Sequence, residues 1–349
     1  METNFKVDMP SFALGYSAGK KKIPPAQEKE ITVNKNGTFR VTPDEGKLLS
    51  KVTVFTDFPA ADMVMQGGIE EADLPNITKL KAYAFYLDTV IKDVSMPNVT
   101  RIENRAFFGC TNFSPSSLPS GLTYVGEYAF GACREFSPSS LPETVTHILD
   151  YAFSECKKLA LTSLPAGLLY INSYAFNNCE ELALTSIPEK VISLREGTFS
   201  GCKKLALTSL PSGITSIATR VFMYCSNIAL TSLPSGVNSL GDYVFYNCEK
   251  LALTSLDGIQ TIGGATFYNC KSLAIDTLPS TLTKIGANAF YGCTALTSIT
   301  FKSKPSSVAS NAFSSCTNLK EIKVPWASGV VSGAPWGATN ANITYNYTE

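Results

Sequence analysis

Ten cysteines are the residues of this sequence best suited to chemistry, and their spacing decides which chemistry is open to them. Zinc and iron–sulfur sites take their thiolates from close pairs such as C-x-x-C, and the sequence contains no such pair. A nucleophilic cysteine would be one distinguished residue, whereas these ten share the same sequence neighbours. They stand 23 residues apart, with one separation of 22, at Cys110, Cys133, Cys156, Cys179, Cys202, Cys225, Cys248, Cys270, Cys293 and Cys316.

The only histidine, His147, is the other candidate for acid–base chemistry. A triad with Asp150 and a nearby serine can be drawn, but one histidine leaves little material for such chemistry or for a metal site. His147 lies between the apolar residues Val145 and Ile148, at a position that varies between repeats. We therefore interpret it as an exposed replacement on the repeat surface, and we expect neither enzyme activity nor a cofactor.

The cysteine spacing belongs to a repeat that includes many other positions. A phenylalanine precedes every cysteine by three residues, and Phe85 continues this series upstream with Asp88 in the cysteine position. Apolar residues follow at +3, +5 and +8 counted from the cysteine, and a second apolar pair stands at +12 and +15. A fixed period of this length is typical of a solenoid, in which each coil buries its apolar face against its neighbours. The sequence predicts a repeat solenoid of about 11–12 coils.

Each predicted coil combines extended segments with turns. We expect a strand around L-x-L-T-S-L-P, a turn at Pro-Ser-Gly, a short extended piece around L-x-x-I and a helical turn carrying A-F-x-x-C. The fold would then be mostly β with short helical turns. Cysteines of neighbouring coils would lie about 5 Å apart at Cα, within disulfide range. We favour a structural column of free thiols, because a buried cysteine packs as a small hydrophobic residue without any bond.

The overall composition narrows the class of protein further. Lys plus Arg (29) equals Asp plus Glu (29), which argues against nucleic acid as a partner. The hydrophobic share of 44% is sufficient for a folded core. No apolar run approaches the roughly 20 residues of a membrane span. Residues 1–26 lack the pattern of a secretion signal, so the expected location is a virion or a bacterial cell surface, or otherwise the cytoplasm.

The repeat motif L-x-L-x-x-L-P…L-x-x-I-x-x-x-A-F-x-x-C resembles the BspA-type leucine-rich repeat. The resemblance covers about residues 66–325, recurs about eleven times, and implies a leucine-rich-repeat solenoid like those of bacterial surface proteins and some phage proteins. The family's usual apolar residue at +6 occurs only early and late, at Val94, Ile299 and Ile322. The middle coils have leucine at +5 and threonine at +6 instead, a departure that we expect to alter the main sheet. The short separation between Cys248 and Cys270 predicts a small local bend.

Two segments outside the repeats resemble parts of phage tail-type proteins of gut bacteria. One covers residues 27–57 and is predicted to form a β-hairpin, because its alternating runs are separated by N-G and D-E-G turns. The other covers residues 334–347. We expect four parts: an N-terminal extension 1–26, a small β-hairpin module 27–60, the leucine-rich-repeat solenoid 61–325 and a C-terminal cap 326–349.

Two sets of surface residues are candidates for ligand contact. Threonines followed by serine recur in five coils; they either connect neighbouring strands, which we favour, or present a polar strip to a repetitive ligand such as a glycan. Tyrosines supply rigid amphipathic contact area, and they are equally common as half-buried solenoid residues. The threonines are Thr162, Thr185, Thr208, Thr231 and Thr254, and the tyrosines are Tyr128, Tyr151, Tyr174, Tyr243, Tyr246, Tyr268 and Tyr291.

These features together indicate a non-enzymatic binding or adhesion protein that presents an extended repeat surface to a protein or glycan on a cell surface. The two end segments favour a phage or prophage tail or receptor-binding component. A bacterial cell-surface adhesin of the BspA-like type is the close alternative, and a polysaccharide hydrolase is a distant one. A homo-oligomer is compatible with each of these interpretations.

Overall fold

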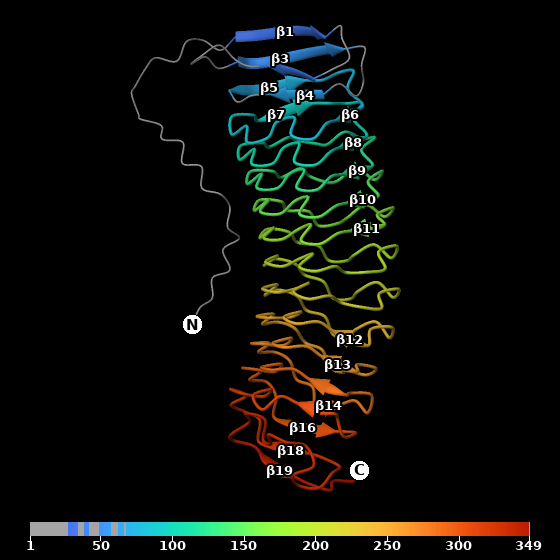
Figure 1. Cartoon of the computed structure of the whole chain (residues 1–349), viewed down its shortest axis with the longest axis vertical. Coiled ribbons are helices and arrows are strands. Elements are labelled where there is room, and N and C mark those ends of the chain that lie inside the picture. The colour runs from blue at the N-terminus through green and yellow to red at the C-terminus, as the bar shows by residue number, and fades with distance from the viewer. Residues whose placement is uncertain (1–26, 34–37, 42–48, 57–61, 66–67, 349) are drawn as a thin grey trace, which may run out of the picture.

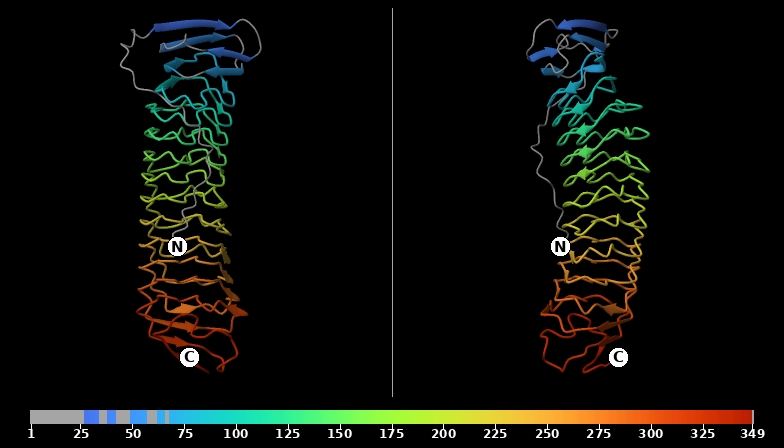
Figure 2. Two further views of the ribbon diagram at one scale, coloured as in Figure 1. Left: turned by 60° about the vertical axis from the view of Figure 1, so that its left-hand side comes forward. Right: turned by 90° about the vertical axis from the view of Figure 1, so that its right-hand side faces the viewer.

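The computed structural model describes residues 27–33, 38–41, 49–56, 62–65 and 68–348, so the extension 1–26 lies outside it. Its coils stack along one axis into a long solenoid, with the first strands at one end and the C-terminal segment at the other (Figure 1). Figure 2 shows from two further sides that the coils follow one another without interruption. The predicted repeat solenoid is confirmed.

One side of the solenoid carries a column of short parallel strands formed by the L-x-x-I segments. Each strand has two residues, of which the second is buried and the first is half-buried or exposed. Ile148 of β10 pairs with its counterparts in the coils before and after it. Bridges from Leu194 through Ile217 to Leu240 extend the second half of the column towards the first. The strands are β6 (Lys79–Leu80), β8 (Arg101–Ile102), β9 (Tyr124–Val125), β10 (His147–Ile148), β11 (Tyr170–Ile171), β12 (Ser239–Leu240), β13 (Thr261–Ile262), β15 (Lys284–Ile285) and β17 (Ser307–Val308).

The L-x-L-x-x-L segment forms strands only towards the two ends of the solenoid. In the coils between the two ends this segment forms no strand, so the predicted strand was wrong there. The backbone N–H of the alanine at +4 makes a single hydrogen bond to the preceding coil, as from Ala206 N to Leu184 O at 3.0 Å. All of these coils lack the apolar residue at +6, and so does the coil of Cys270, which forms only a two-residue strand. The strands at the ends are β5 (Ile69–Asp73), β7 (Asp93–Ser95), β14 (Thr277–Leu278), β16 (Ser298–Phe301), β18 (Glu321–Lys323) and β19 (Asn342–Thr344).

The A-F-x-x-C segment forms consecutive turns, and no helix occurs among the described residues. Successive backbone N–H groups alternate between two kinds of acceptor, one in the next coil and one within the same turn. Phe130 N donates to Ala152 O of the next coil at 2.8 Å, and Gly131 N donates to Tyr128 O of its own turn at 3.0 Å. The residue before the cysteine has a left-handed backbone, as at Asn178 with φ 56°. The predicted helical turn was wrong because bonds between coils replace the i→i−4 bonds of a helix.

A stack of phenylalanine rings fills the centre of the solenoid. Neighbouring rings lie 5.0–6.0 Å apart between centroids and within 18° of parallel. Every ring is fully buried, and burial of one such side chain stabilises the fold by about 1.5–3 kcal/mol. The stack consists of Phe85, Phe107, Phe130, Phe153, Phe176, Phe199, Phe222, Phe245, Phe267, Phe290 and Phe313.

The N-terminal strands pair in parallel, so the predicted β-hairpin was wrong. β1 (Gln27–Val33) pairs with β3 (Leu49–Thr56), and the same sheet continues through β5 to β7. β2 (Thr38–Val41) pairs in parallel with β4 (Asp62–Met65) in a separate sheet. A parallel pair needs a crossover connection rather than a tight turn. The N-terminal strands are therefore stacked layers, like the coils that follow them.

Residues 326–348 cover the last coil. Strand β19 pairs with β18, and Phe313 N donates to Trp336 O at 2.8 Å, which replaces the bond to a next coil. Trp336 is fully buried, and its ring lies 5.6 Å from Phe301 and 6.5 Å from Trp326. The two tryptophans thus shield apolar surface that the end of a solenoid would otherwise expose.

The coil that is one residue short keeps all of its columns in register. The rings of Phe245 and Phe267 lie 5.7 Å apart, and Cys270 Sγ donates to Phe245 O at 3.0 Å. The chain turns at Gly258, whose φ of 80° is in the left-handed region. The missing residue is therefore accommodated in this turn.

Candidate functional site

The ten cysteines predicted as a column lie buried inside the solenoid as free thiols. Each Sγ donates to the carbonyl oxygen of the phenylalanine in the preceding coil, at 2.9–3.1 Å. Phe176 O, for example, accepts from Cys179 N and from Cys202 Sγ, at 3.1 Å in both cases. The thiol thus uses the second acceptor position of a carbonyl that already takes part in a turn.

Burial makes these thiols poor nucleophiles. Loss of hydration destabilises the thiolate and raises the pKa of every cysteine in the column. Cys316, next to the C-terminal segment, is 4% exposed, and burial raises its pKa to about 11. Among the described residues no three His, Cys, Asp or Glu side chains form a group that could hold a metal ion.

Asp88 occupies the cysteine position of the first coil that has the phenylalanine. Its Oδ1 accepts from Val90 N at 3.0 Å and from Ile91 N at 3.3 Å. Its Oδ2 is buried without a hydrogen-bond partner among the described residues. Burial raises the pKa of this carboxyl group, although the backbone N–H groups of Val90, Ile91 and Gly68 act in the opposite direction.

His147 is half-buried rather than exposed, and it does not form a triad. Its Nδ1 lies 2.8 Å from Thr146 Oγ1, whereas Asp150 Oδ1 accepts from Ser173 N at 2.9 Å. The described contacts include no bond between His147 and Asp150. The imidazole instead lies 5.0 Å from the ring of Tyr170, one coil further on. The sequence analysis missed this aromatic pair, although the separation of 23 residues between its members could have revealed it.

Three of the predicted tyrosines stack face to face on the side of the A-F-x-x-C turns, and their stack has a charged residue at each end. Tyr128 and Tyr151 lie 4.5 Å apart and Tyr151 and Tyr174 lie 4.9 Å apart between ring centroids. Arg105 lies over Tyr128, 4.9 Å from its centroid, and Tyr174 Oη donates to Glu196 Oε1 at 2.7 Å. Burial and the Glu196 carboxylate raise the pKa of Tyr174 to about 12. The ring faces therefore contact one another and offer mainly edges to a partner.

The other four predicted tyrosines gather in the C-terminal half. Tyr246, Tyr268 and Tyr291 stack at 4.6 Å and 4.4 Å, and Tyr243 lies 5.8 Å from Tyr246. Tyr224, which the sequence analysis did not single out, meets Tyr246 edge-on at 5.4 Å. Tyr224 is 45% exposed. The structure thus separates the predicted tyrosines into two groups and adds a fifth ring to the second.

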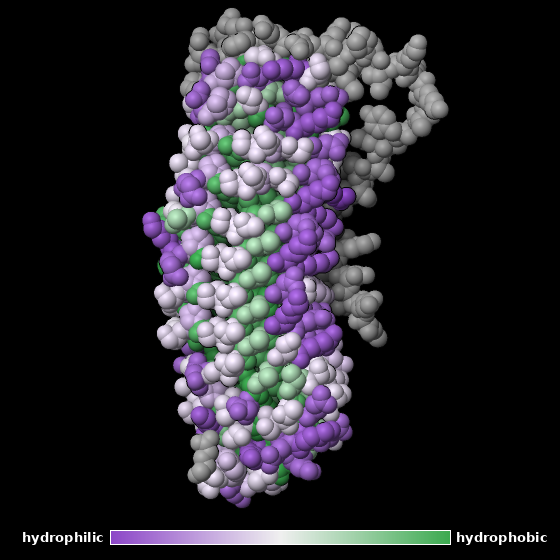
Figure 3. Space-filling view, turned by 180° about the vertical axis from the view of Figure 1, so that it is seen from behind, coloured by the Kyte–Doolittle hydropathy of each residue, from purple (hydrophilic) through white to green (hydrophobic). Residues whose placement is uncertain are grey.

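The five predicted threonines are all exposed on the L-x-L-x-x-L side. Thr254 donates to Thr231 O twice, from its backbone N at 3.2 Å and from its Oγ1 at 3.4 Å, and no other bond joins members of this set in the described residues. Figure 3 shows a face on which a green apolar stripe runs lengthwise between a purple column and a near-white one. The middle coils have two mostly charged residues, then an apolar run and then Thr-Ser, as in Lys-Lys-Leu-Ala-Leu-Thr-Ser after Cys156 and Cys202, and this order accounts for the charged, apolar and hydroxyl columns.

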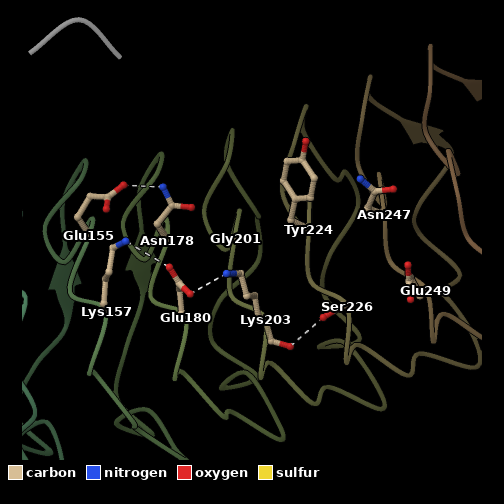
Figure 4. A pocket seen from close by; sticks show the side chains of 10 residues that line it. All are labelled: Glu155, Lys157, Asn178, Glu180, Gly201, Lys203, Tyr224, Ser226, Asn247 and Glu249. Carbon is tan, nitrogen blue, oxygen red and sulfur yellow. Dashed lines mark hydrogen bonds and ion pairs between the residues drawn. The ribbon is translucent and has the colours of Figure 1, made fainter. Parts of the chain in front are cut away.

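A polar groove crosses five coils on the side of the turns, and no feature of the sequence analysis pointed to it. It has a volume of about 490 Å³ (Figure 4). Its lining repeats two positions, the residue before the cysteine and the residue after it. It consists of Glu155, Lys157, Asn178, Glu180, Gly201, Lys203, Tyr224, Ser226, Asn247 and Glu249.

The stacked coils, the parallel strand column and the L-x-x-I…A-F-x-x-C repeat define a leucine-rich-repeat solenoid. The family described as the BspA type leucine rich repeat region matches residues 78–206, 158–273 and 252–331. These matches extend together over residues 78–331, which is more than half of the chain. The chain belongs to the BspA-type leucine-rich-repeat family.

Solved structures of similar proteins come from several bacteria. A leucine rich cell surface protein of Faecalibacterium prausnitzii is 25% identical, covers 86% of this chain and 90% of its own, and has a TM-score of 0.52. A leucine-rich repeat protein of Bacteroides ovatus is 21% identical, with coverages of 88% and 91% and a TM-score of 0.43. One of Eubacterium ventriosum is 20% identical, with coverages of 90% and 91% and a TM-score of 0.45.

Two further comparisons concern relatives and membranes. No curated protein gives a significant match to this chain. Within the described residues, no helix has the length and apolar character needed to cross a bilayer.

Proposed function

We propose that this chain is a non-enzymatic binding protein of a bacterial cell surface, an adhesin that recognises a protein or a glycan on another surface. Membership of the BspA-type family supports this proposal, and so does the likeness to the F. prausnitzii protein, which is described as a cell surface protein. Leucine-rich-repeat solenoids are typical binding scaffolds because stacked repeats create extended surfaces.

The observation that carries the proposal is the order of the outer surface. Every coil places the same side-chain position at the same angle around the axis, so tyrosine, threonine and charged residues form columns several coils long. The thiols of the cysteine column and the rings of the phenylalanine column are buried. What remains accessible is suited to contact rather than to covalent chemistry.

Binding of the labelled intact chain to epithelial cells and to immobilised mucin tests the proposal. We expect saturable binding that unlabelled chain displaces. Replacement of Tyr246, Tyr268 and Tyr291 by serine should weaken this binding, and replacement of Thr162, Thr185 and Thr208 by alanine provides the comparison. Absence of saturable binding to cells, mucin and extracellular-matrix protein would contradict the proposed function.

A component of a phage or prophage tail is a second candidate. It rests on the resemblance of residues 27–57 and 334–347 to phage tail-type proteins, and the family match at 78–331 does not reach either segment. Mass spectrometry of purified virions from an induced culture tests this candidate. Presence of the chain in the particle, as a monomer or as a homo-oligomer, would favour it over the adhesin.

A polysaccharide hydrolase is the third and weakest candidate. His147 and Asp150 bond to other groups, as described above. Ser17, in a segment that reads G-x-S-x-G like a hydrolase nucleophile motif, lies outside the described residues. Incubation with cell-wall and mucin glycans should release no products. Release that is abolished by His147→Ala or Ser17→Ala would make the chain an enzyme.

A further inference from the structure

The groove combines two facing columns of side chains. The column before the cysteine contributes mainly Asn and Glu around Gly201 and Tyr224, and the column after it contributes Lys and Glu. Figure 4 shows the lining residues as two rows, each with one residue from each of the neighbouring coils. At about 4.8 Å per coil, the lining residues extend over roughly 20 Å along the solenoid axis. The groove is therefore long enough for a chain molecule that lies parallel to the axis.

Most of the charged side chains that line the groove form ion pairs with a neighbouring coil. Glu180 accepts from Lys203 at 2.7 Å on one side and forms an ion pair with Lys157 at 3.4 Å on the other (Figure 4). The hydrogen bond from Lys203 lowers the pKa of Glu180, which keeps this carboxylate ionised at neutral pH. Glu249 pairs in the same way with Lys271 at 2.8 Å. Alternating signs leave little surplus charge to select an ion or a strongly charged polymer.

The groove also offers hydrogen-bonding groups, because its amide side chains can donate and accept and its carboxylates can accept. Asn178 Nδ2 donates to Glu155 Oε1 at 2.5 Å, and Asn269 Nδ2 donates to Asn247 Oδ1 at 2.9 Å. A carboxylate has about four acceptor sites, and an amide has two donors and two acceptor sites, so each of these groups retains positions for a ligand. Hydroxyl groups, which donate and accept, match such a lining.

Tyr224 supplies the one aromatic surface of the groove. Its φ of 62° is in the left-handed region, where a bulky side chain costs about 1–2 kcal/mol, and neighbouring coils have Asn178, Gly201 and Asn247 at this position. Its ring is 45% exposed and leads to the stack that begins at Tyr246. A flat ring beside polar groups suits the C–H face of a sugar.

We propose that this groove binds a neutral oligosaccharide laid along the solenoid axis, with one sugar ring against Tyr224 and the others between the amide and carboxylate side chains. This proposal rests on the proposed binding function and names its ligand class. An extended peptide is a poorer match, because peptide grooves offer a free strand edge or apolar pockets. The lining listed above has polar side chains, one glycine and one tyrosine.

Calorimetric titration of the full chain with neutral tetrasaccharides of glucose, mannose and N-acetylglucosamine tests the proposal. We expect at least one to bind, with little dependence on salt. Tyr224→Asn should weaken this binding about tenfold or more, since it removes the ring that contacts the sugar. Asparagine is the suitable replacement, because it adopts the same left-handed backbone at Asn178 and Asn247.

Tyr170→Asn is the matched control. Tyr170 is 48% exposed on the strand column, outside the groove lining, so this variant should bind the sugar like the unchanged protein. Equal affinity of Tyr224→Asn and the unchanged protein would overturn the proposal, as would tighter binding of acidic than of neutral glycans. If the chain binds cells or mucin but none of the neutral sugars, the groove proposal fails and the adhesin proposal stands. If it binds none of these surfaces, the adhesin proposal fails.

Discussion

The middle coils and the C-terminal coils build the same part of the repeat in different ways. In the coil of Cys202 the buried residues follow the cysteine at +3, +5 and +8, whereas in the coils of Cys293 and Cys316 they follow at +3, +6 and +8. The second arrangement forms the strands β16 and β18, whereas the first forms no strand in the coil of Cys202 and only the two-residue strand β14 in the coil of Cys270. The phenylalanine and cysteine columns pass through both regions unchanged.

The period of a strand explains this difference. Alternate residues of a strand point to the same face, so +6 and +8 can both face the core from an extended chain. Positions +5 and +8 cannot, and the residues between them, Thr208 and Ser209 in the coil of Cys202, are both exposed. A shift of one apolar residue by one position thus removes the second sheet without disturbing the core.

The largest expected change in the free energy of unfolding is at position +5, where the two regions have different residues. Leu207→Ala should lower the free energy of unfolding by about 2–5 kcal/mol, because it leaves a cavity beneath a fully buried leucine. Ser298→Ala, at the same position of the Cys293 coil, should change it by less than about 0.5 kcal/mol, because Ser298 is only half-buried. Chemical denaturation followed by circular dichroism measures both.

The reciprocal pair at +6 completes this test. Ile299→Ala should cost about as much as Leu207→Ala, and Thr208→Ala about as little as Ser298→Ala. Similar losses for Thr208→Ala and Ile299→Ala would show that the two regions do not differ as described.

The next effect concerns the first coil, which has Asp88 where the other coils have cysteine. Asp88→Asn removes a buried charge and should raise the free energy of unfolding by about 1–3 kcal/mol at neutral pH. Burial raises the pKa of Asp88 in the folded state, so folding favours the protonated acid and the native protein loses stability as the pH rises above about 4. The advantage of the variant should therefore grow with pH. Denaturation curves across the acidic range measure it, and a constant difference would contradict this account.

A smaller effect is expected where the two regions are alike. Ala132 and Ser315, in an early and a late coil, both precede the cysteine with a left-handed backbone, at φ 60° and 59°. Ala132→Gly and Ser315→Gly should each raise the free energy of unfolding by about 0.5–1 kcal/mol, because relief of the strain exceeds the added entropy of the unfolded chain. Thermal unfolding measures both variants. A gain in one region alone would mean that the turn column is not uniform.

The last prediction involves reactivity without a change of stability. In the native protein, Cys316 should react with a thiol reagent before the cysteines of the middle coils, because it is 4% exposed and the others are inaccessible. Its rate should remain about two orders of magnitude below that of a free thiol, since its pKa is about 11. Mass spectrometry of partially labelled protein identifies the site, and the denatured chain should label at all ten positions. Equal labelling of Cys202 and Cys316 would contradict the buried column.

Much of the fold was predictable because the repeated residues have the same structural role, burial in the core, from coil to coil. The phenylalanine at −3, the cysteine and the L-x-x-I pair are buried in every coil, so their spacing reports the coil directly. The continuous strand was wrong because buried residues at +5 and +8 do not follow the period of a strand. The helical turn and the N-terminal hairpin were wrong for a different reason, which they share. Each is a local pattern that hydrogen bonds between neighbouring coils override, as the bond from Phe130 N to Ala152 O shows.

The candidate surface was predictable only in part. The tyrosine columns could be read from the repeat, since rings one period apart, such as Tyr268 and Tyr291, stack in the structure. The groove was not predicted, although the ion pairs of Glu180 join lysines that stand one repeat period away on either side. The spacing could have predicted these pairs, but a hollow between side chains depends on their packing and has no signal in the spacing.

The amino-acid sequence alone determined that near-identical coils stack with phenylalanine and thiol inside, because burial of apolar side chains at a fixed period has one solution. The tertiary structure decided which backbone each segment adopts and which outer side chains meet. Those choices depend on hydrogen bonds and contacts between neighbouring coils, whose partners are about 23 residues apart and become neighbours only when the stack has formed.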